Sequence, residues 1–170
     1  MGKIAAQKDA IQWRREARDA DKRVVLVCGC FDLLHPGHIR LLEQARSLGD
    51  ALIVAVESDA SIRGRTGSAQ RPITPAAERM EILAALAAVD CVVEADRDDA
   101  SLGEWLVQLA PDVIAAGADP RGQRDRGARA PHTDLAHPAA QAAGAQLVYI
   151  PTEPGFSTSL LIERIAQTAS

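Results

Sequence analysis

Short apolar runs alternate five times with segments of helical periodicity along this chain, and this alternation limits the possible folds more than any other feature. The runs are apolar at nearly every position, as expected of parallel strands that are buried on both faces. We therefore predict an α/β fold with a doubly wound, five-stranded parallel sheet and helices on both faces. In such a sheet, ligands bind beyond the carboxyl ends of the strands, where the strand order reverses. The expected strands are residues 23–28, 51–56, 91–93, 112–116 and 146–150.

Local signals place the helices between these strands. Apolar residues recur at helical spacing from Gly37, and Thr74 followed by Pro75 is typical of a helix N-cap with proline in the first turn. Ser101 and Glu104 have the spacing of a capping box. A last helix is expected to begin near Ser157, whereas the stretch between the second strand and Thr74 is expected to be a loop.

Composition restricts the domain count and the partners. The 170 residues are enough for one domain with its own core. We expect a single domain over residues 1–170, with a helical extension at 1–21 and an irregular loop at 119–133 that is rich in Arg and Gly. The net charge of −4 gives no general attraction to nucleic acid or to an anionic membrane. No apolar run approaches the ~20 residues of a membrane span and the first residues lack the core of a signal peptide, so a cytoplasmic location is expected.

Three cysteines are too few for a disulfide framework, and all of them lie in apolar runs. Cys28 and Cys30 are spaced as a metal-binding pair could be, but no second Cys or His pair stands at ligand spacing. We therefore expect buried, reduced thiols, Cys91 included, and no metal held by protein ligands alone.

The segment Gly29-Cys-Phe-Asp-Leu-Leu-His-Pro-Gly-His38 carries the strongest functional signal. A glycine at the end of the first strand allows the backbone to approach a ligand closely. His35 and His38 flank Gly37 at the start of the next helix, where free N–H groups and the helix dipole favour an anion. Two imidazoles at that point can donate hydrogen bonds to phosphate oxygens and stabilise the charge of leaving pyrophosphate. The alternative is that both histidines merely cap the helix.

Two further groups of residues could complete a phosphate site. The hydroxyls of Ser157 and Thr158 lie at the expected start of the last helix, where ordinary helix capping is the alternative role. Arginines follow the second strand and could clamp a triphosphate, although each of them taken singly is more typical of a solvated surface charge. These arginines are Arg63, Arg65, Arg71 and Arg79.

Together these motifs resemble the cytidylyltransferase-like nucleotidyltransferases, with greatest similarity to the heptose 1-phosphate adenylyltransferases. The resemblance covers roughly residues 24–165 in matching order. It implies a Rossmann-like, HUP-type fold and the transfer of AMP from ATP to a sugar 1-phosphate with release of pyrophosphate. The matching motifs are the segment 29–38, Ser58-Asp-Ala-Ser61, Arg71-Pro-Ile73, Glu78-Arg79 and Ser157-Thr158.

The resemblance also implies roles for individual residues. His35 and His38 would be catalytic, binding the phosphates and stabilising the transition state. Mg²⁺ would accompany the nucleotide without a protein cage, as expected of an ion that keeps its waters. The partners would be ATP and a phosphorylated sugar, and the chain would form a homodimer. The nucleotide would contact Gly29, Cys30, Phe31, Asp32, Gly37, Arg63, Arg65, Arg79, Gly117, Asp119, Ser157 and Thr158.

Three departures from the pattern of the heptose enzymes bear on the acceptor. Those enzymes usually carry Thr-Asn where this chain has Val27-Cys28, and Lys-Gly-Gly-Asp-Tyr where it has Ala116-Gly-Ala-Asp-Pro120. The loop that follows is also longer. Two alternatives therefore stay open: an enzyme like the glycerol-3-phosphate cytidylyltransferases, which would use CTP and a polyol phosphate, and a protein that binds nucleotide without turnover.

Overall fold

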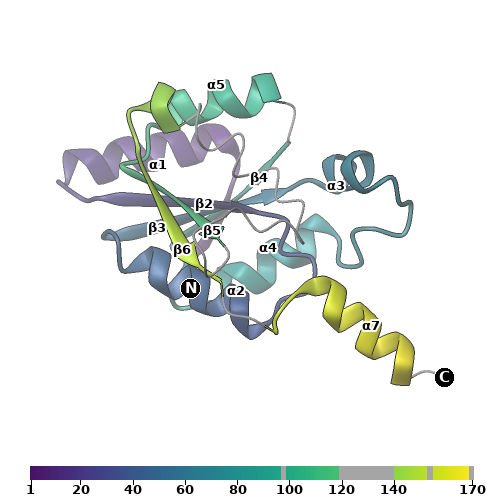
Figure 1. The fold of residues 1–170 in the computed structure, drawn as a ribbon. Helices are drawn as coiled ribbons and strands as arrows, with labels where there is room; N and C mark the ends of the chain where they lie inside the picture. Colours follow the sequence, from purple (N-terminus) through teal and green to yellow (C-terminus); the bar gives the residue numbers. More distant parts are fainter. Residues whose placement is uncertain (97–98, 119–139, 153–154, 169–170) are drawn as a thin grey trace.

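The computed structural model describes residues 1–96, 99–118, 140–152 and 155–168, which form a six-stranded, all-parallel sheet (Figure 1). The strand order is β1-β4-β3-β2-β5-β6. Since β2 lies between β3 and β5, the chain builds outwards in both directions from β2, and the topological switch point lies between β2 and β5. The strands are β1 (Lys3–Ala5), β2 (Val24–Gly29), β3 (Ala51–Glu57), β4 (Cys91–Ala95), β5 (Val113–Ala118) and β6 (Gln146–Pro151).

Helices cover both faces of the sheet, as the alternation predicts. Helices α1 and α5 lie on one face, and α2 and α4 lie on the other (Figure 1). Alternate residues of β2 serve the two cores: Val24 and Leu26 pack under α1 and α5, whereas Val25 and Val27 pack against α2 and α4. The helices are α1 (Gln7–Asp19), α2 (Pro36–Arg46), α3 (Asp59–Thr66), α4 (Ala76–Ala84), α5 (Asp99–Leu109) and α7 (Thr158–Thr168).

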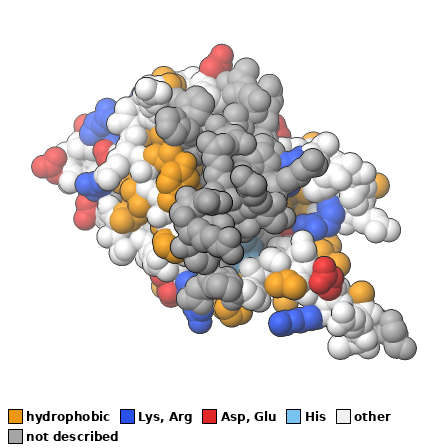
Figure 2. Space-filling model, viewed as in Figure 1, with side chains coloured by type: hydrophobic (Ala, Val, Ile, Leu, Met, Phe, Trp, Pro, Cys, Tyr) orange, Lys and Arg blue, Asp and Glu red, His pale blue; other side chains and the backbone are white. Residues whose placement is uncertain are grey.

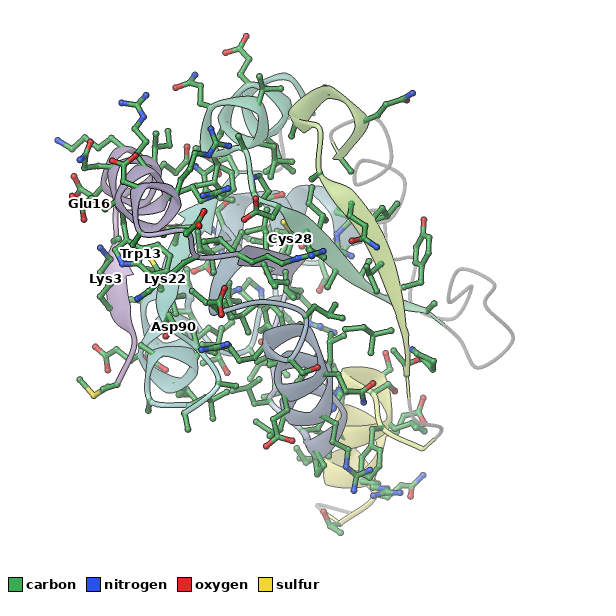
Figure 3. All side chains as sticks on the ribbon, turned by 90° about the vertical axis from the view of Figure 1, so that its left-hand side faces the viewer. Lys3, Trp13, Glu16, Lys22, Cys28 and Asp90 are labelled. Atoms are coloured by element: carbon green, nitrogen blue, oxygen red, sulfur yellow. The ribbon has the colours of Figure 1, made fainter. Side chains whose placement is uncertain are left out.

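The sixth strand corrects the prediction of five. Residues 3–5, expected to begin a helix, instead form the edge strand β1, which pairs with β4, and the helix of the N-terminal extension begins at Gln7. The strand has only one large apolar residue, Ile4, and it is 48% exposed, so no buried run marks the strand in the sequence. Lys3 at its start lies over the ring of Trp13 on α1 at 5.2 Å, which holds strand and helix together (Figure 3).

The stretch after β3 differs from the expected loop, because it contains α3. Ser58 is the N-cap of this helix, its hydroxyl accepts from the N–H of Ser61, and Gly67 ends it in the left-handed conformation at φ 64°. One buried residue, Ile62, is too little to give a helical period.

The cap of α4 also differs from the prediction. Pro75 rather than Thr74 is the N-cap, and the acceptor for the N–H of Ala76 is the carboxylate of Asp59, at 2.9 Å. Similarly, Ser101 lies inside α5, which begins at Asp99, so it is not a cap.

Two further expectations concern the irregular loop and the absence of a membrane span. The loop expected at 119–133 lies outside the described residues. Within the described part of the chain, no helix is both long and apolar enough to cross a bilayer. Side chains of both charge signs are interspersed with apolar ones on the face in Figure 2, including along the projecting helix α7.

Candidate active site

The candidate site lies beyond the carboxyl end of β2, next to the switch point. Gly29 is the last residue of β2, and the chain then runs through residues 30–35 into the N-terminus of α2 (Figure 1). The start of α7 reaches the same place from the end of β6, because Phe156 contacts the first turn of α2. Segments that are far apart in the sequence therefore meet at a helix N-terminus, as ligand sites in this class of sheet require.

His35 and His38 form a stacked pair at this helix N-terminus. His35 is the N-cap of α2, and its Nδ1 accepts from the backbone N–H of His38 at 3.3 Å. The two ring centroids are 3.7 Å apart with an interplanar angle of 15°. Gly37 makes this packing possible, since a Cβ there would lie 3.1 Å from both His35 Nδ1 and Phe156 Cβ. The structure thus brings together three of the residues expected in the site.

Both imidazoles are neutral at neutral pH. Burial, and secondarily the neighbouring His35, lower the pKa of His38 to about 3, and burial lowers the pKa of His35. Because Nδ1 of His35 accepts a hydrogen bond, its proton is on Nε2, which remains a donor. Nδ1 of His38 is buried without a hydrogen-bond partner among the described residues. The pair therefore offers polar ring atoms that a ligand can satisfy.

Phe31 packs against His38 of the pair. It is 3% exposed, has a positive φ of 51° and meets His38 edge-on, with ring centroids 5.3 Å apart. Its ring lies on Gly29, where a Cβ would come within 2.5 Å of it. Gly29 and Phe31 thus act here as packing partners of the histidines, and the close approach explains why a glycine ends β2.

The carboxylate of Asp32 is occupied by hydrogen bonds within the protein. The residue is 3% exposed, and its carboxylate accepts from Arg71 Nε at 2.7 Å and from the backbone N–H groups of Ile73 and Thr74 at 2.8 and 2.9 Å. The structure therefore uses Asp32 and Arg71 to fix the loop before α4 beside the end of β2.

Arg79 does not project from α4 as a clamp. Its side chain is fully buried, donates to the carbonyls of Cys30, Glu57 and Thr74, and pairs with Asp59 at 2.6 Å. A guanidinium with its donors committed in this way ties the ends of β2 and β3 to α3 and α4. The sequence placed Arg79 near the site without showing which carbonyls it satisfies, and its direct contact with phosphate stays a prediction.

The arginines of α3 are placed differently from each other. Arg65 makes two hydrogen bonds with the buried carboxylate of Glu57, at 2.9 and 3.2 Å, which raise the pKa of Arg65. Arg63 is exposed and has no ion pair with another described residue. Of the two, Arg63 is the cation left for a ligand in this conformation.

The cysteines are reduced thiols, as expected. Burial raises the pKa of Cys28 to about 12 and that of Cys91 to about 11, so both are protonated and unreactive. Cys28 lies within the sheet (Figure 3). Cys30 follows β2 and is half-buried, and its pKa is raised first by burial and then by Glu57. Within the described residues, no three His, Cys, Asp or Glu side chains are grouped so that they could hold a metal ion.

The remaining residues expected in the site lie at the ends of β5 and β6 and at the start of α7. A Cβ at Gly117 would lie 2.9 Å from Thr152, whose N–H and hydroxyl both bond the carbonyl of Ala118, at 2.6 and 2.8 Å. Ser157 caps α7, accepting from the N–H of Leu160 at 3.1 Å, and Thr158 is the first residue of that helix. Asp119 lies outside the described residues.

A family model described as Cytidylyltransferase-like matches residues 26–164, a span that includes both histidines and the start of α7. The chain belongs to the cytidylyltransferase-like family. The family and the Rossmann-like α/β fold predicted from the motifs are thereby confirmed.

Curated relatives of this cytidylyltransferase-like chain include two proteins called Bifunctional protein HldE. The one from Alkalilimnicola ehrlichii is 42% identical over 150 residues, which is 88% of this chain and 29% of that protein. The one from Koribacter versatilis is 42% identical over 153 residues, which is 90% of this chain and 28% of that protein. The chain therefore spans less than a third of the length of these relatives.

Two solved structures have the same architecture. A lipopolysaccharide core biosynthesis protein from Thermoplasma volcanium superposes with a TM-score of 0.61 at 26% identity, covering 78% of this chain and 98% of that one. Pantoate-beta-alanine ligase from Francisella tularensis superposes with a TM-score of 0.56 at 16% identity, covering 94% and 69%. The second likeness concerns the fold alone.

Sequence reasoning missed several residues that shape this cytidylyltransferase-like site. Glu57, which holds Arg65, has no motif of its own, although its place at the carboxyl end of a buried strand is a usable signal. Asp59 lies within the motif Ser58-Asp-Ala-Ser61, but the motif does not show its pairing with Arg79. Phe156 stacks on His35 with ring centroids 6.3 Å apart. A lone aromatic before a Ser-Thr pair, in a chain with so few aromatics, could have marked it.

Proposed function

We propose that this cytidylyltransferase-like chain transfers AMP from ATP to a sugar 1-phosphate of the heptose 1-phosphate kind, with release of pyrophosphate. The observation that carries the proposal is the stacked, neutral histidine pair at the N-terminus of α2, beyond the end of β2. The 42% identity to Bifunctional protein HldE supports the heptose acceptor.

The reaction needs positioning and charge stabilisation more than covalent chemistry. An oxygen of the acceptor phosphate attacks the α-phosphorus of ATP, the bond to the bridging oxygen breaks, and pyrophosphate leaves. Nε2–H of His35 and the free N–H groups of α2 are donors for the oxygens on which charge develops. A preorganised donor of this kind is worth about 3–4 kcal/mol of the barrier.

Groups around the pair would hold the rest of the nucleotide. Ser157 and Thr158, at the N-terminus of α7, are hydroxyl donors for phosphate, and Arg63 is the exposed cation nearest in sequence to the end of β3. The nucleotide would contact the backbone at the strand ends, at Gly29 and Gly117, and Asp119 would contact the ribose.

Mg²⁺ would enter with the triphosphate and neutralise part of its charge. The donor set fits this role, because the carboxylate of Asp32 is occupied by Arg71 and two N–H groups and no cluster of acids stands ready elsewhere in the described part of the chain. The ion would therefore be held by phosphate oxygens and water. We further propose that the protein is cytoplasmic and forms a homodimer. Light scattering on the purified protein tests the dimer.

Pyrophosphate release tests the function. ATP, CTP, GTP and UTP are each paired with heptose 1-phosphate, hexose 1-phosphate, glycerol 3-phosphate and ethanolamine phosphate. We expect turnover with ATP and a sugar 1-phosphate. Turnover with CTP and glycerol 3-phosphate would instead assign a cytidylyltransferase, and nucleotide binding without turnover on any pair would assign a binding protein.

Variants of the two histidines, with a control on the same helix, test the role of the pair in this assay. His35→Ala and His38→Ala should each lower kcat by about 10²–10³-fold while the far-ultraviolet spectrum stays that of a folded protein. Gln44→Ala, an exposed change on the same helix, is the control and should turn over normally. Near-normal rates in either histidine variant would contradict the proposed role.

A further inference from the structure

A continuous stack of side chains runs from α2 through the start of α7 to the end of β2. The guanidinium of Arg40 lies over the ring of Phe156 at 5.5 Å, and Phe156 is stacked on His35 with centroids 6.3 Å apart and an interplanar angle of 23°. His35 is stacked on His38 at 3.7 Å, and Phe31 meets His38 edge-on at 5.3 Å. Each imidazole thus has a phenylalanine neighbour in addition to the other imidazole.

Phe156 connects this stack to helix α7. No residue of α7 is buried, and the helix projects from the body of the molecule (Figure 1). Phe156 directly precedes it and reaches Gly37, where an added Cβ would lie 3.1 Å from Phe156 Cβ. The contact brings the first residues of α7 against the first turn of α2.

We infer that Phe156 is a positioning residue, which holds the ring plane of His35 and seats the Ser157–Thr158 end of α7 beside the histidine pair. The inference rests on the proposed function for its catalytic consequence. Phe156 acts through its neighbours: its ring limits the rotation of His35 about its side-chain bonds, and its backbone leads directly into the hydroxyl pair. Aromatic pairs at these separations contribute about 0.5–1.5 kcal/mol beyond the area they bury.

Arg40 strengthens the same arrangement. A cation over a ring face attracts the ring, and Arg40 belongs to the same helix as His38, so it draws Phe156 towards α2 rather than towards solvent. Phe156 is nevertheless 38% exposed, which is unusual for a ring that serves only as core. A ring that is this exposed contributes little to the free energy of folding. We therefore attribute the placement of Phe156 to the residues that it holds in position.

The test compares Phe156→Leu, which keeps apolar bulk and removes the ring, with Phe156→Tyr, which keeps the ring. The first readout is the NMR spectrum of the imidazole protons, in which His35→Gln identifies the His35 signals among those of the four histidines. We expect Phe156→Leu to displace the His35 signals, because the ring current of Phe156 is lost, and Phe156→Tyr to retain them. Ile165→Ala, a change of a 59% exposed side chain on α7, is the control and should leave them unmoved.

The second readout is kinetic. With ATP varied, Phe156→Leu should lower kcat/KM by roughly ten- to a hundredfold, and Phe156→Tyr should restore most of it, as expected when donors are misplaced by a fraction of an ångström. A wild-type protein without turnover would refute the proposed function but not the positioning role, which the imidazole signals still decide. His35 signals unchanged in Phe156→Leu, or kcat/KM unchanged in an active enzyme, would overturn the inference.

Discussion

At the scale of single residues, the site consists of neutral groups that are held by packing. His35 and His38 lie face to face because burial keeps both uncharged, since two imidazolium rings 3.7 Å apart would repel each other. Neutral rings donate through one nitrogen only, so the hydrogen bond from the His38 N–H to His35 Nδ1 decides which atom faces a ligand. The geometry of the pair thereby sets its chemistry.

The pH dependence of stability follows from His38. Its pKa is about 3 in the folded protein against an ordinary value of 6.5, so between these values the unfolded chain binds a proton that the folded chain does not. The free energy of unfolding should therefore fall with decreasing pH below 6.5, by up to about 1.4 kcal/mol per pH unit from this group. In urea titrations between pH 7 and pH 5, His38→Gln should lose less stability than the wild type. Parallel losses in the two proteins would contradict this assignment.

Gly29 offers a sharper test of the packing behind the pair. In Gly29→Ala the new Cβ would meet the buried ring of Phe31 at 2.5 Å, and this ring rests on His38. We expect a loss of about 1–3 kcal/mol in the free energy of unfolding, as for other overpacked cores, together with reduced turnover. Gly64→Ala is the matched control, because a Cβ there meets nothing within 4 Å. Equal behaviour of the two variants would show that the ring moves freely.

Sequence reasoning predicted the histidines correctly as a pair at a helix start, because the pattern His-Pro-Gly-His determines its own local geometry. It could not predict how Asp32 and Arg79 are used. Arg71, the partner of Asp32, is 39 residues away in the chain, and Arg79 bonds to carbonyls of Cys30 and Glu57, which no local pattern reveals. Roles that depend on which backbone atoms meet in space need the fold first.

At the scale of elements, the ion pair of Asp59 with the fully buried Arg79 joins α3 and α4 to the strand ends. Asp59 caps α4 through Ala76 and pairs with Arg79, whose other donors close the ends of β2 and β3. Asp59→Ala would leave a fully buried guanidinium without its carboxylate, so we expect a loss of about 3 kcal/mol in the free energy of unfolding. Glu78→Ala, an exposed acid in the first turn of α4, is the control.

The control Glu78→Ala sets the size of the loss that Asp59→Ala must exceed. An exposed acid near a helix N-terminus contributes about 0.3–1 kcal/mol, so Glu78→Ala measures what α4 loses from its dipole alone. If Asp59→Ala costs no more than Glu78→Ala in urea titrations, the Arg79 network does not hold the strand ends. A larger loss with lowered turnover is the expected outcome, since Arg79 bonds the carbonyl of Cys30, which directly precedes Phe31 behind the histidine pair.

The elements that the sequence predicted are those with a buried apolar run or a strong period. Strands β2 to β6 and helices α2, α4, α5 and α7 were all expected within a few residues. The exceptions share a cause: β1 has one large apolar residue, Ile4, and α3 has one buried residue, Ile62. Their formation depends on neighbours, namely the edge of β4 for β1 and the Ser58 cap with Glu57 and Arg65 for α3.

At the scale of the whole molecule, the two ends of the sheet have different tasks. At the amino ends, three aspartates that directly precede strands each accept an N–H from the start of the neighbouring strand or the residue before it: Asp50 from Arg23, Asp90 from Leu52 and Asp112 from Val24, at 2.7–2.8 Å. The histidine pair, the serine and threonine of α7 and the arginines of α3 gather at the carboxyl ends. Stability and chemistry are therefore separable in this fold.

Asp112 tests that separation. One of its carboxylate oxygens accepts from Arg14, which is 2% exposed on α1, and the other accepts from the N–H of Val24 at the start of β2. Asp112→Ala should lower the free energy of unfolding by about 2–3 kcal/mol, the usual range for hydrogen bonds to charged groups, and Asp112→Asn by less. In assays at a temperature where both variants remain folded, kcat/KM should equal that of the wild type, because Asp112 directly precedes β5 at the amino ends of the strands, whereas the histidine pair lies beyond their carboxyl ends. Reduced turnover in folded Asp112→Ala would mean that the amino ends help to set the geometry of the site.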